Sequence, residues 1–294
     1  MGHGTHWEAV LTNLNEDFAA AFDMGIQKGE LIGRRHLKAW TGPLGESPAD
    51  VMLLQGAKSG FGVLGVVVSA NSQTYLQTAF PVASDGMLHT LQVISIHESS
   101  YGLEGCITAE LGDATVNFFD PHYALSGDLY RPGARLQVSL AGIAYVLARA
   151  EPGQVVHHPE VGQIHLDGAA MLLPIKEPPP VALSSNGFGL SYIQAQQHAP
   201  GLDDYRFRGP VKDVAACSFL NRPAWRITAT LLRTDNGQNE IDIPIYVTQD
   251  KLPTDFSTMP GQDLTGVLWL QGRAVSNSCE AKLSTLGVER SAPN

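Results

Sequence analysis

The apolar residues of this chain come in short runs separated by glycine and proline, and this spacing limits the folds open to it most strongly. The 294 residues include 30 glycines and 18 prolines, the residue types that favour turns. The run at residues 63–69 has the length and β-branched character of one buried strand. Frequent turns between such runs predict many short strands rather than long helices. Hydrophobic residues make up 44% of the chain, so we expect an ordered, β-rich fold.

One helical pattern stands at the amino end. Apolar residues recur there at steps of three and four, and Thr5 followed by Glu8 resembles a capping box; the apolar stripe is Trp7, Leu11, Leu14, Phe18, Phe22 and Ile26. Residues 31–40 fit a second short helix or a strand, and β-branched runs follow from residue 51. We therefore expect a helix-bearing α+β unit over residues 1–88.

An internal sequence repeat predicts two similar blocks after that unit. Pro132-Gly133 and Pro260-Gly261 lie 128 positions apart, and Leu136 meets Leu264 at the same offset. Each block reads as three strands, a short helical or polar segment, a Pro-Gly turn and a further strand. We expect small antiparallel β domains at residues 89–150 and 205–276, as OB-like barrels or as two unrelated sheets. A Pro/Gly-rich connector at 151–204 and a polar tail at 277–294 complete this α+β, β-rich division.

The formal net charge of −10 disfavours nucleic acid as the partner, because binding through phosphates normally requires a basic face. The dense basic run at residues 28–38 is interpreted as a solvated helix face. Three widely spaced cysteines and the lack of a leader pattern favour the cytoplasm. No apolar stretch has the length needed to cross a bilayer, so no membrane partner is expected.

The densest cluster of metal-capable side chains consists of His157, His158, His165 and Asp167, with Glu160 between them. Imidazole and carboxylate groups hold zinc and other divalent ions, which could activate water for hydrolysis. The spacing matches no established zinc motif, and Asp167 also fits a turn with Gly168. A metal-dependent hydrolase is therefore kept as an alternative, and no organic cofactor is expected.

No catalytic residues are assigned. The glycine string at 60–65 resembles a dinucleotide motif, but β-branched residues follow it where that motif needs a helix. Asp120 and His122 could form an oriented base, yet no serine or cysteine sits in a nucleophile elbow. Cys106 and Cys217 lie in apolar stretches and fit buried packing.

Trp225, Trp269, Gln271 and Arg273 lie on predicted strands of the last block and are the candidate binding residues. Aromatic side chains on a barrel wall can stack on unpaired bases, whereas the apolar neighbours of Trp269 favour a place in the core. Because no nucleophile, base and activator occur together, we expect a non-enzymatic binding or assembly module. Its partner is expected to be a protein, recruited through a sheet edge or surface patch. Single-stranded nucleic-acid binding by tandem OB-like domains is the alternative.

Overall fold

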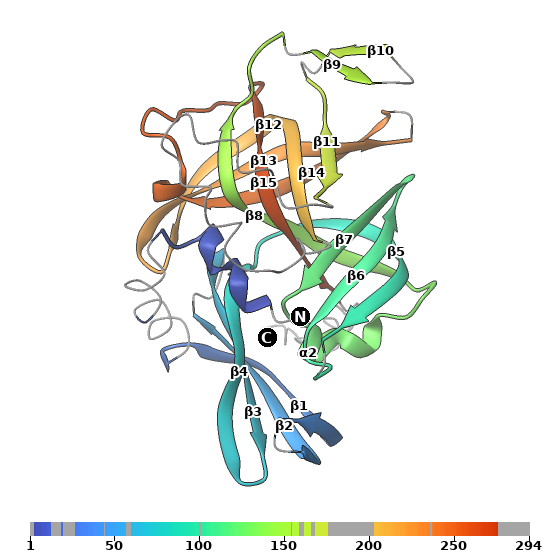
Figure 1. Ribbon diagram of the computed structural model, residues 1–294, viewed down its shortest axis with the longest axis vertical. Coiled ribbons are helices and arrows are strands. Elements are labelled where there is room, and N and C mark those ends of the chain that lie inside the picture. Colours follow the sequence, from blue (N-terminus) through green and yellow to red (C-terminus); the bar gives the residue numbers. More distant parts are fainter. Residues whose placement is uncertain are drawn as a thin grey trace, which may run out of the picture.

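The computed structural model describes residues 3–12, 19, 27–43, 45–56, 60–99, 101–153, 155–158, 162–165, 168–175, 203–235 and 237–275. Strands dominate this part of the chain, as the sequence predicts (Figure 1). The helical elements are short: η1 (His3–Ala9), α2 (Tyr123–Ser126), η3 (Gly127–Leu129) and η6 (Gln249–Lys251). The β-rich prediction is therefore confirmed.

The predicted amino-terminal helix falls mostly on residues outside the described part. The described part of it includes η1, a 3-10 helix; Trp7 in this helix and Leu11, which follows it, are buried. Trp7 donates its indole N–H to the carbonyl of Ala79, so this segment packs against β4. Within the described residues, the one α-helix with assigned bounds is α2, which comes after residue 88 and therefore fits poorly with a helix-bearing first unit.

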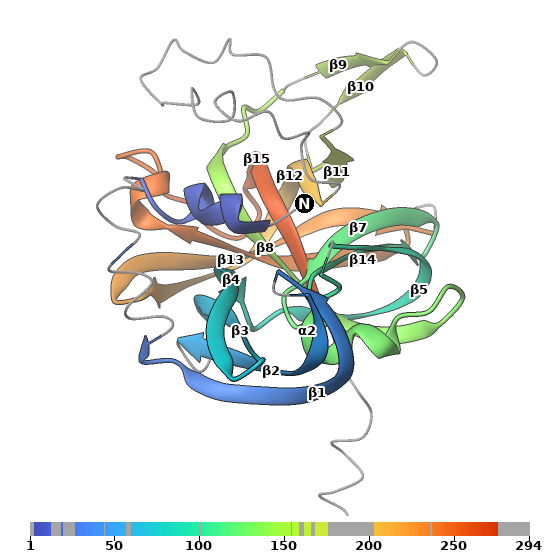
Figure 2. The ribbon, with the colours of Figure 1, turned by 60° about the horizontal axis from the view of Figure 1, so that its bottom comes forward.

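A four-stranded antiparallel meander follows and extends away from the rest of the molecule (Figure 1). Its strands are β1 (Glu30–Gly42), β2 (Gly45–Gly56), β3 (Phe61–Ala70) and β4 (Gln73–Ala83), and Figure 2 shows the sheet strongly curved. Asn71 and Ser72, with φ of 52° and 62°, form the two-residue turn between β3 and β4 that suits the twist of a hairpin. Residues 30–38 of the basic run therefore lie in a strand, and the helix-face interpretation is wrong because these residues pair with β2 as part of β1.

The remaining long strands form two closed rings. The first block supplies β5 (Met87–Glu98), β6 (Gly105–Leu111), β7 (Ala114–Asp120) and β8 (Arg135–Arg149). The second block supplies β12 (Asp204–Phe219), β13 (Arg222–Thr234), β14 (Asn239–Thr248) and β15 (Asp263–Ala274). One ring runs β5-β6-β7-β15-β8, and the other runs β12-β13-β14-β8-β15. Both rings share the antiparallel pair β8–β15, and short parallel contacts, β7 with β15 and β14 with β8, close them.

The two blocks repeat one local hydrogen-bond arrangement. Strands β8 and β15 begin at Arg135 and Asp263, 128 positions apart. The amides of Gly133 and Gly261 donate to the carbonyls of Val93 and Val211, at 2.7 and 2.9 Å. The register of β5 against β6 shifts directly after Val93, and that of β12 against β13 directly after Val211.

Each ring nevertheless needs a strand from the other block, through the shared pair. The predicted segment boundaries at 88, 150, 204 and 276 stay a prediction. The connector contains β9 (Val155–His158), β10 (Gly162–His165) and β11 (Met171–Pro174); β9 pairs with β10, and β11 extends the sheet beside β12.

Two buried clusters use opposite faces of the shared strands. Leu140 and Leu268 belong to a cluster formed by side chains from all eight ring strands. Ile143 and Trp269 belong to a second cluster, in which the meander packs on the outside of the ring wall. Alternate side chains of a strand point to opposite faces, so β8 and β15 connect both cores.

Candidate functional site

The proposed metal ligands lie on and beside the small β9–β10 hairpin. The backbone ladder pairs His158 with Gly162, His157 with Gln163 and His165 with Val155. The side chains of this hairpin, and Asp167 and Glu160 altogether, lie outside the described part of the chain. The metal site stays a prediction. Among the side chains that are described, no three of His, Cys, Asp and Glu come together as a metal site would require.

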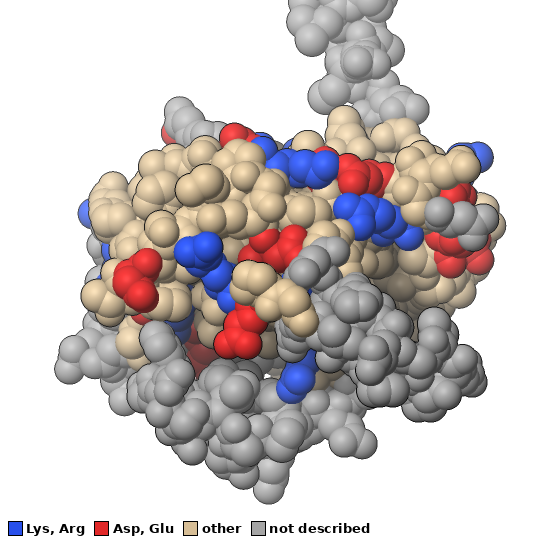
Figure 3. Space-filling model, turned by 90° about the horizontal axis from the view of Figure 1, so that it is seen from above, with Lys and Arg blue, Asp and Glu red and all other residues tan. Residues whose placement is uncertain are grey.

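The four predicted binding residues do not form one surface. The indole of Trp225 is partly exposed and donates to Oε1 of Gln249 at 2.6 Å. Trp269 is 0% exposed, stacks on His6 at a centroid distance of 4.0 Å and donates to Asp203 at 2.6 Å. Its ring therefore presents no face to a ligand, as its apolar neighbours in the sequence indicate. Figure 3 shows acidic and basic side chains interspersed on one face of the molecule, with no continuous basic patch there.

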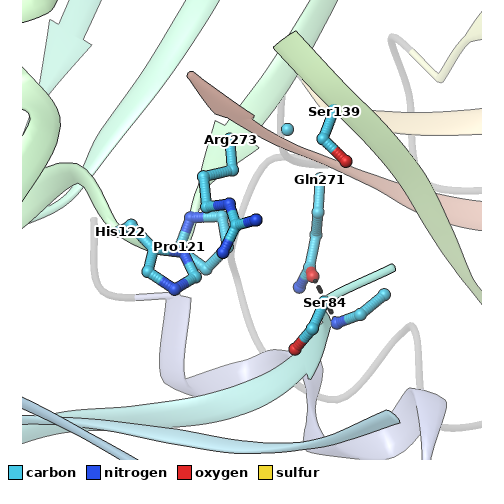
Figure 4. Close-up of a pocket in the computed structure, with 8 residues that line it drawn as sticks. Ser84, Pro121, His122, Ser139, Gln271 and Arg273 are labelled. Carbon is cyan, nitrogen blue, oxygen red and sulfur yellow. Dashed lines mark hydrogen bonds between the residues drawn. The ribbon is translucent and has the colours of Figure 1, made fainter. Parts of the chain in front are cut away.

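Gln271 and Arg273 do lie together, at the carboxyl end of β15, beside a closely packed recess that has no room for a water molecule (Figure 4). The end of β4 with the residue after it, the two residues before α2 and the first third of β8 supply its other walls. The lining residues are Ala83, Ser84, Pro121, His122, Ser139, Gln271, Gly272 and Arg273. The sequence pattern missed His122, Ser84 and Ser139 as neighbours of Arg273, because only the fold brings these four segments together.

Gln271 has a structural role on this wall. Its Oε1 accepts the amide of Ala83 at 3.0 Å, and its Nε2 donates to the carbonyl of Pro81 at 2.9 Å. The side chain is 1% exposed and binds the edge of β4 as a neighbouring strand would. Gln271 is therefore not free to bind a ligand.

Asp120 and His122 do not form a catalytic pair. The Asp120 carboxylate accepts the backbone amide of His122 at 2.7 Å, the Ser126 hydroxyl at 2.6 Å and the Tyr130 hydroxyl at 2.7 Å. Burial raises the pKa of Asp120 to about 6, against the lowering effect of these donors. Burial, with a further contribution from Arg273, lowers the pKa of His122 to about 3. The carboxylate thus holds the start of α2, and the ring of His122 is left neutral.

The other sequence candidates have structural places. Gly60 has a φ of 81° at the start of β3, and a strand follows it, as expected, instead of a helix that could face a pyrophosphate. Burial raises the pKa of both described cysteines, that of Cys217 to about 11, so neither forms a thiolate readily.

The ring strands are paired with other strands on both sides. The two outer strands of the meander, β1 and β4, are each paired with a strand on one side. The outer edge of β4 is occupied by side chains: Trp7 bonds the carbonyl of Ala79, and Gln271 bonds Pro81 and Ala83. In the part of the chain that the structure describes, β1 pairs with β2 alone, and no strand lies on its other side. Among the described strands, β1 is thus the open edge of this sheet.

Helix α2 packs on one face of β1 and leaves its edge accessible. A Cβ atom added at Gly33 would lie 2.2 Å from Cδ1 of Leu125, and Cβ atoms point out of the plane of a sheet. Arg35 reaches from the same region of β1 to Asp128 at 2.6 Å. Two apolar side chains at the start of this edge are exposed, Leu31 by 57% and Ile32 by 41%.

Among the residues described, no helix combines the length and apolar character that a membrane crossing requires. Comparison of the chain with family models, with curated proteins and with solved structures found no match.

Proposed function

We propose that this protein is a non-enzymatic binding module that recruits a protein partner by strand addition to the outer edge of β1. The open edge of β1 is the observation that carries this proposal. An edge strand offers a row of backbone donors and acceptors, and an extended segment of another protein satisfies them by pairing. The 13 residues of β1 provide a longer edge than most recognition segments need.

The side chains of β1 favour a partner over a second copy of the same edge. The register of β1 shifts between Leu31 and Gly33 and again between Leu37 and Trp40. Such bulges twist an edge and hinder pairing between identical edges. Arg34 pairs with Asp50 at 2.6 Å, whereas exposed Lys38 has no ion pair among the described side chains. A segment with an apolar residue for Leu31 and an acidic residue for Lys38 would complement this strand.

We further infer that each ring is an OB-like unit within a duplicated core. In support, each ring has five strands, and a short helical segment lies between the third and fourth strands of each block: α2 with η3, and η6. The fifth strand of each ring comes from the other block, so these units would be interlocked rather than separate.

Photo-crosslinking can test the strand-addition proposal. A benzophenone side chain replaces Leu31 and, as a matched control, Leu88, which is 60% exposed on β5. Both proteins are irradiated in an extract of the source cells, and the cross-linked partner segment is identified by mass spectrometry. We expect a defined segment at position 31 and none at position 88.

Hydrogen exchange then distinguishes strand pairing from other contacts. The synthetic partner segment is added to the unmodified protein, and exchange of the β1 amides is measured. The outward amides should slow by about tenfold or more, because pairing removes them from water. Unchanged exchange in β1, or the same segment cross-linked from both positions, would overturn the proposal.

A further inference from the structure

Residues 6–12, called the strap below, are held on the outside of the ring wall, where η1 contacts β4 and β8. Trp7 is 3% exposed and donates its indole N–H to the carbonyl of Ala79 at 3.1 Å. Near the other end of the strap, the ammonium group of Lys251 in η6 donates to the carbonyl of Leu11 at 3.0 Å. A segment attached by a few such contacts can open while the strands beneath it stay folded.

The imidazole of His6 is buried between the strap and the ring wall. His6 is 7% exposed, and its ring stacks on Trp269 at a centroid distance of 4.0 Å with 7° between the planes. Its Nδ1 is hydrogen-bonded to the hydroxyl of Tyr145, and this hydroxyl donates to Oδ1 of Asp204 at 3.0 Å. Because a hydroxyl has one hydrogen, Tyr145 must accept from His6, so Nδ1 carries a proton.

Carboxyl groups dominate the charges around this chain of hydrogen bonds. Asp203, next to Asp204 at the start of β12, accepts the indole N–H of Trp269 at 2.6 Å. Burial raises the pKa of Tyr145 well above its usual value, and Asp204, Asp203 and Glu8 raise it further. The negative charges that disfavour a tyrosinate here favour an imidazolium at the same place. The face of an indole ring attracts a cation as well.

One cation faces the same region from η6. Burial lowers the pKa of Lys251, while Asp250 and Glu8 raise it. Burial also raises the pKa of Glu8. Even where Glu8 is uncharged, Asp250 balances Lys251, and the two aspartates at the start of β12 remain to favour a positive charge on His6. Their attraction opposes the cost of burying the imidazolium.

We propose that His6 is a proton-dependent latch: its imidazolium form holds the strap on the ring wall, and loss of the proton releases the strap. A histidine in water titrates near pH 6.5, and the docked ring keeps its proton to a higher pH. The contribution of this ring to docking is therefore fully present below about pH 6.5 and is lost as the pH rises above that value. Release uncovers the carbonyl of Ala79 on the outer edge of β4. The latch includes no residue of β1, so it stands or falls independently of strand addition.

Nuclear magnetic resonance of the full-length protein tests the protonation directly. The imidazole nitrogen shifts of His6 are followed from pH 5 to pH 9, and His97, an exposed histidine of β5, is the internal control. We expect His6 to keep its second ring proton to a higher pH than His97 does. Loss of that proton from His6 at the same pH as from His97, or at a lower pH, would overturn the proposal.

Hydrogen exchange measures the release of the strap. The amides of Val10 and Leu11 donate to the carbonyl of Trp7 at 3.0 and 2.8 Å, and so short a helical turn does not persist away from the wall. Corrected for the intrinsic exchange rate, their protection should fall about tenfold or more between pH 6.5 and 8.5. The folded-state pKa values of Asp120 and His122, about 6 and about 3, lie below this window. Protection that stays constant or rises with pH would contradict a latch.

Two aspartate variants of β12 locate the effect. Asp204→Asn keeps an acceptor for the Tyr145 hydroxyl and removes one negative charge, so the fall in protection should shrink several-fold. Asp213→Asn removes an exposed carboxylate of the same strand and should keep the wild-type behaviour. Thermal unfolding checks that both variants fold. An unchanged pH dependence in Asp204→Asn, or an equal change in both variants, would show that this carboxylate does not hold the proton on His6.

Discussion

At the scale of single residues, the neighbours Asp120 and His122 have pKa values displaced in opposite senses by the same cause, burial. The folded-state pKa of Asp120, about 6, lies above its unfolded value near 4. Its contribution to stability is therefore present at low pH and lost as the pH rises from about 4 to about 6. The folded-state pKa of His122, about 3, lies below its unfolded value, so its contribution is lost as the pH falls from about 6.5 to about 3.

In the variant Asp120→Asn, the pH dependence of stability that His122 contributes should no longer be offset by the titration of Asp120. The variant removes the carboxyl titration, so its free energy of unfolding should rise more steeply than that of the wild type between pH 4 and 6. The difference should amount to about 1–3 kcal/mol across this range. Urea unfolding at several pH values measures it. Asp113→Asn, at an exposed turn, is the control; a wild-type slope in Asp120→Asn would show that Asp120 titrates normally.

His122→Asn should make the free energy of unfolding depend less steeply on pH, the opposite of the change expected for Asp120→Asn. Because the variant lacks the imidazole that must be protonated on unfolding, its stability should fall less than that of the wild type as the pH drops from 6.5 to 4. His97→Asn changes an exposed histidine of β5 and should keep the wild-type profile. The same urea series compares all three proteins. Identical acid sensitivity in His122→Asn and the wild type would contradict the burial argument.

At the scale of elements, close approach between strands matters more than turn geometry. A Cβ atom at Gly209 in β12 would lie 1.9 Å from the carbonyl oxygen of Thr230 in β13, which is backbone and cannot rotate away. A Cβ atom at Gly261 would meet nothing within 4 Å, although its φ of 86° disfavours other residues. The first glycine is required by contact and the second by conformation.

The contact at Gly209 and the backbone conformation at Gly261 predict different losses of stability on substitution by alanine. Gly209→Ala should lower the free energy of unfolding by about 2 kcal/mol or more, since the strands must separate. Gly261→Ala should lower it by about 1–2 kcal/mol, the strain of a left-handed residue with a side chain. Urea midpoints with unchanged m-values measure both losses. A larger loss at Gly261 would show that turn conformation, not strand contact, limits this part of the fold.

The elements also show where local patterns were sufficient. The Pro-Gly turns and the β-branched runs predicted β8, β15 and β3 well, because turn preference and alternation act between neighbours in the chain. The pattern of the basic run predicts a helix face, whereas the structure places residues 30–38 of that run in the strand β1. Arg34 pairs across the sheet with Asp50, and such pairing is invisible in the local pattern.

At the scale of the whole molecule, the shared strands should make the two rings unfold together. Leu268 of β15 is 0% exposed in the core of the ring strands, so Leu268→Ala should cost about 2–5 kcal/mol. The protection of amides in both β6 and β13 should fall by the same amount, as native-state hydrogen exchange measures. Leu64→Ala, at an equally buried site in the meander, is the comparison. Lower protection in β13 alone would indicate two independent units.

By itself, the sequence determined the β-rich composition of this protein, the places of most strands, and the element order that recurs 128 positions apart. These properties follow from interactions between residues close in the chain. The tertiary structure decided that both blocks share β8 and β15, that Gln271 binds the edge of β4, and that His122 meets Arg273. Each of these depends on segments far apart in the chain, whose contact is set by which apolar faces and strand edges can be satisfied together in three dimensions.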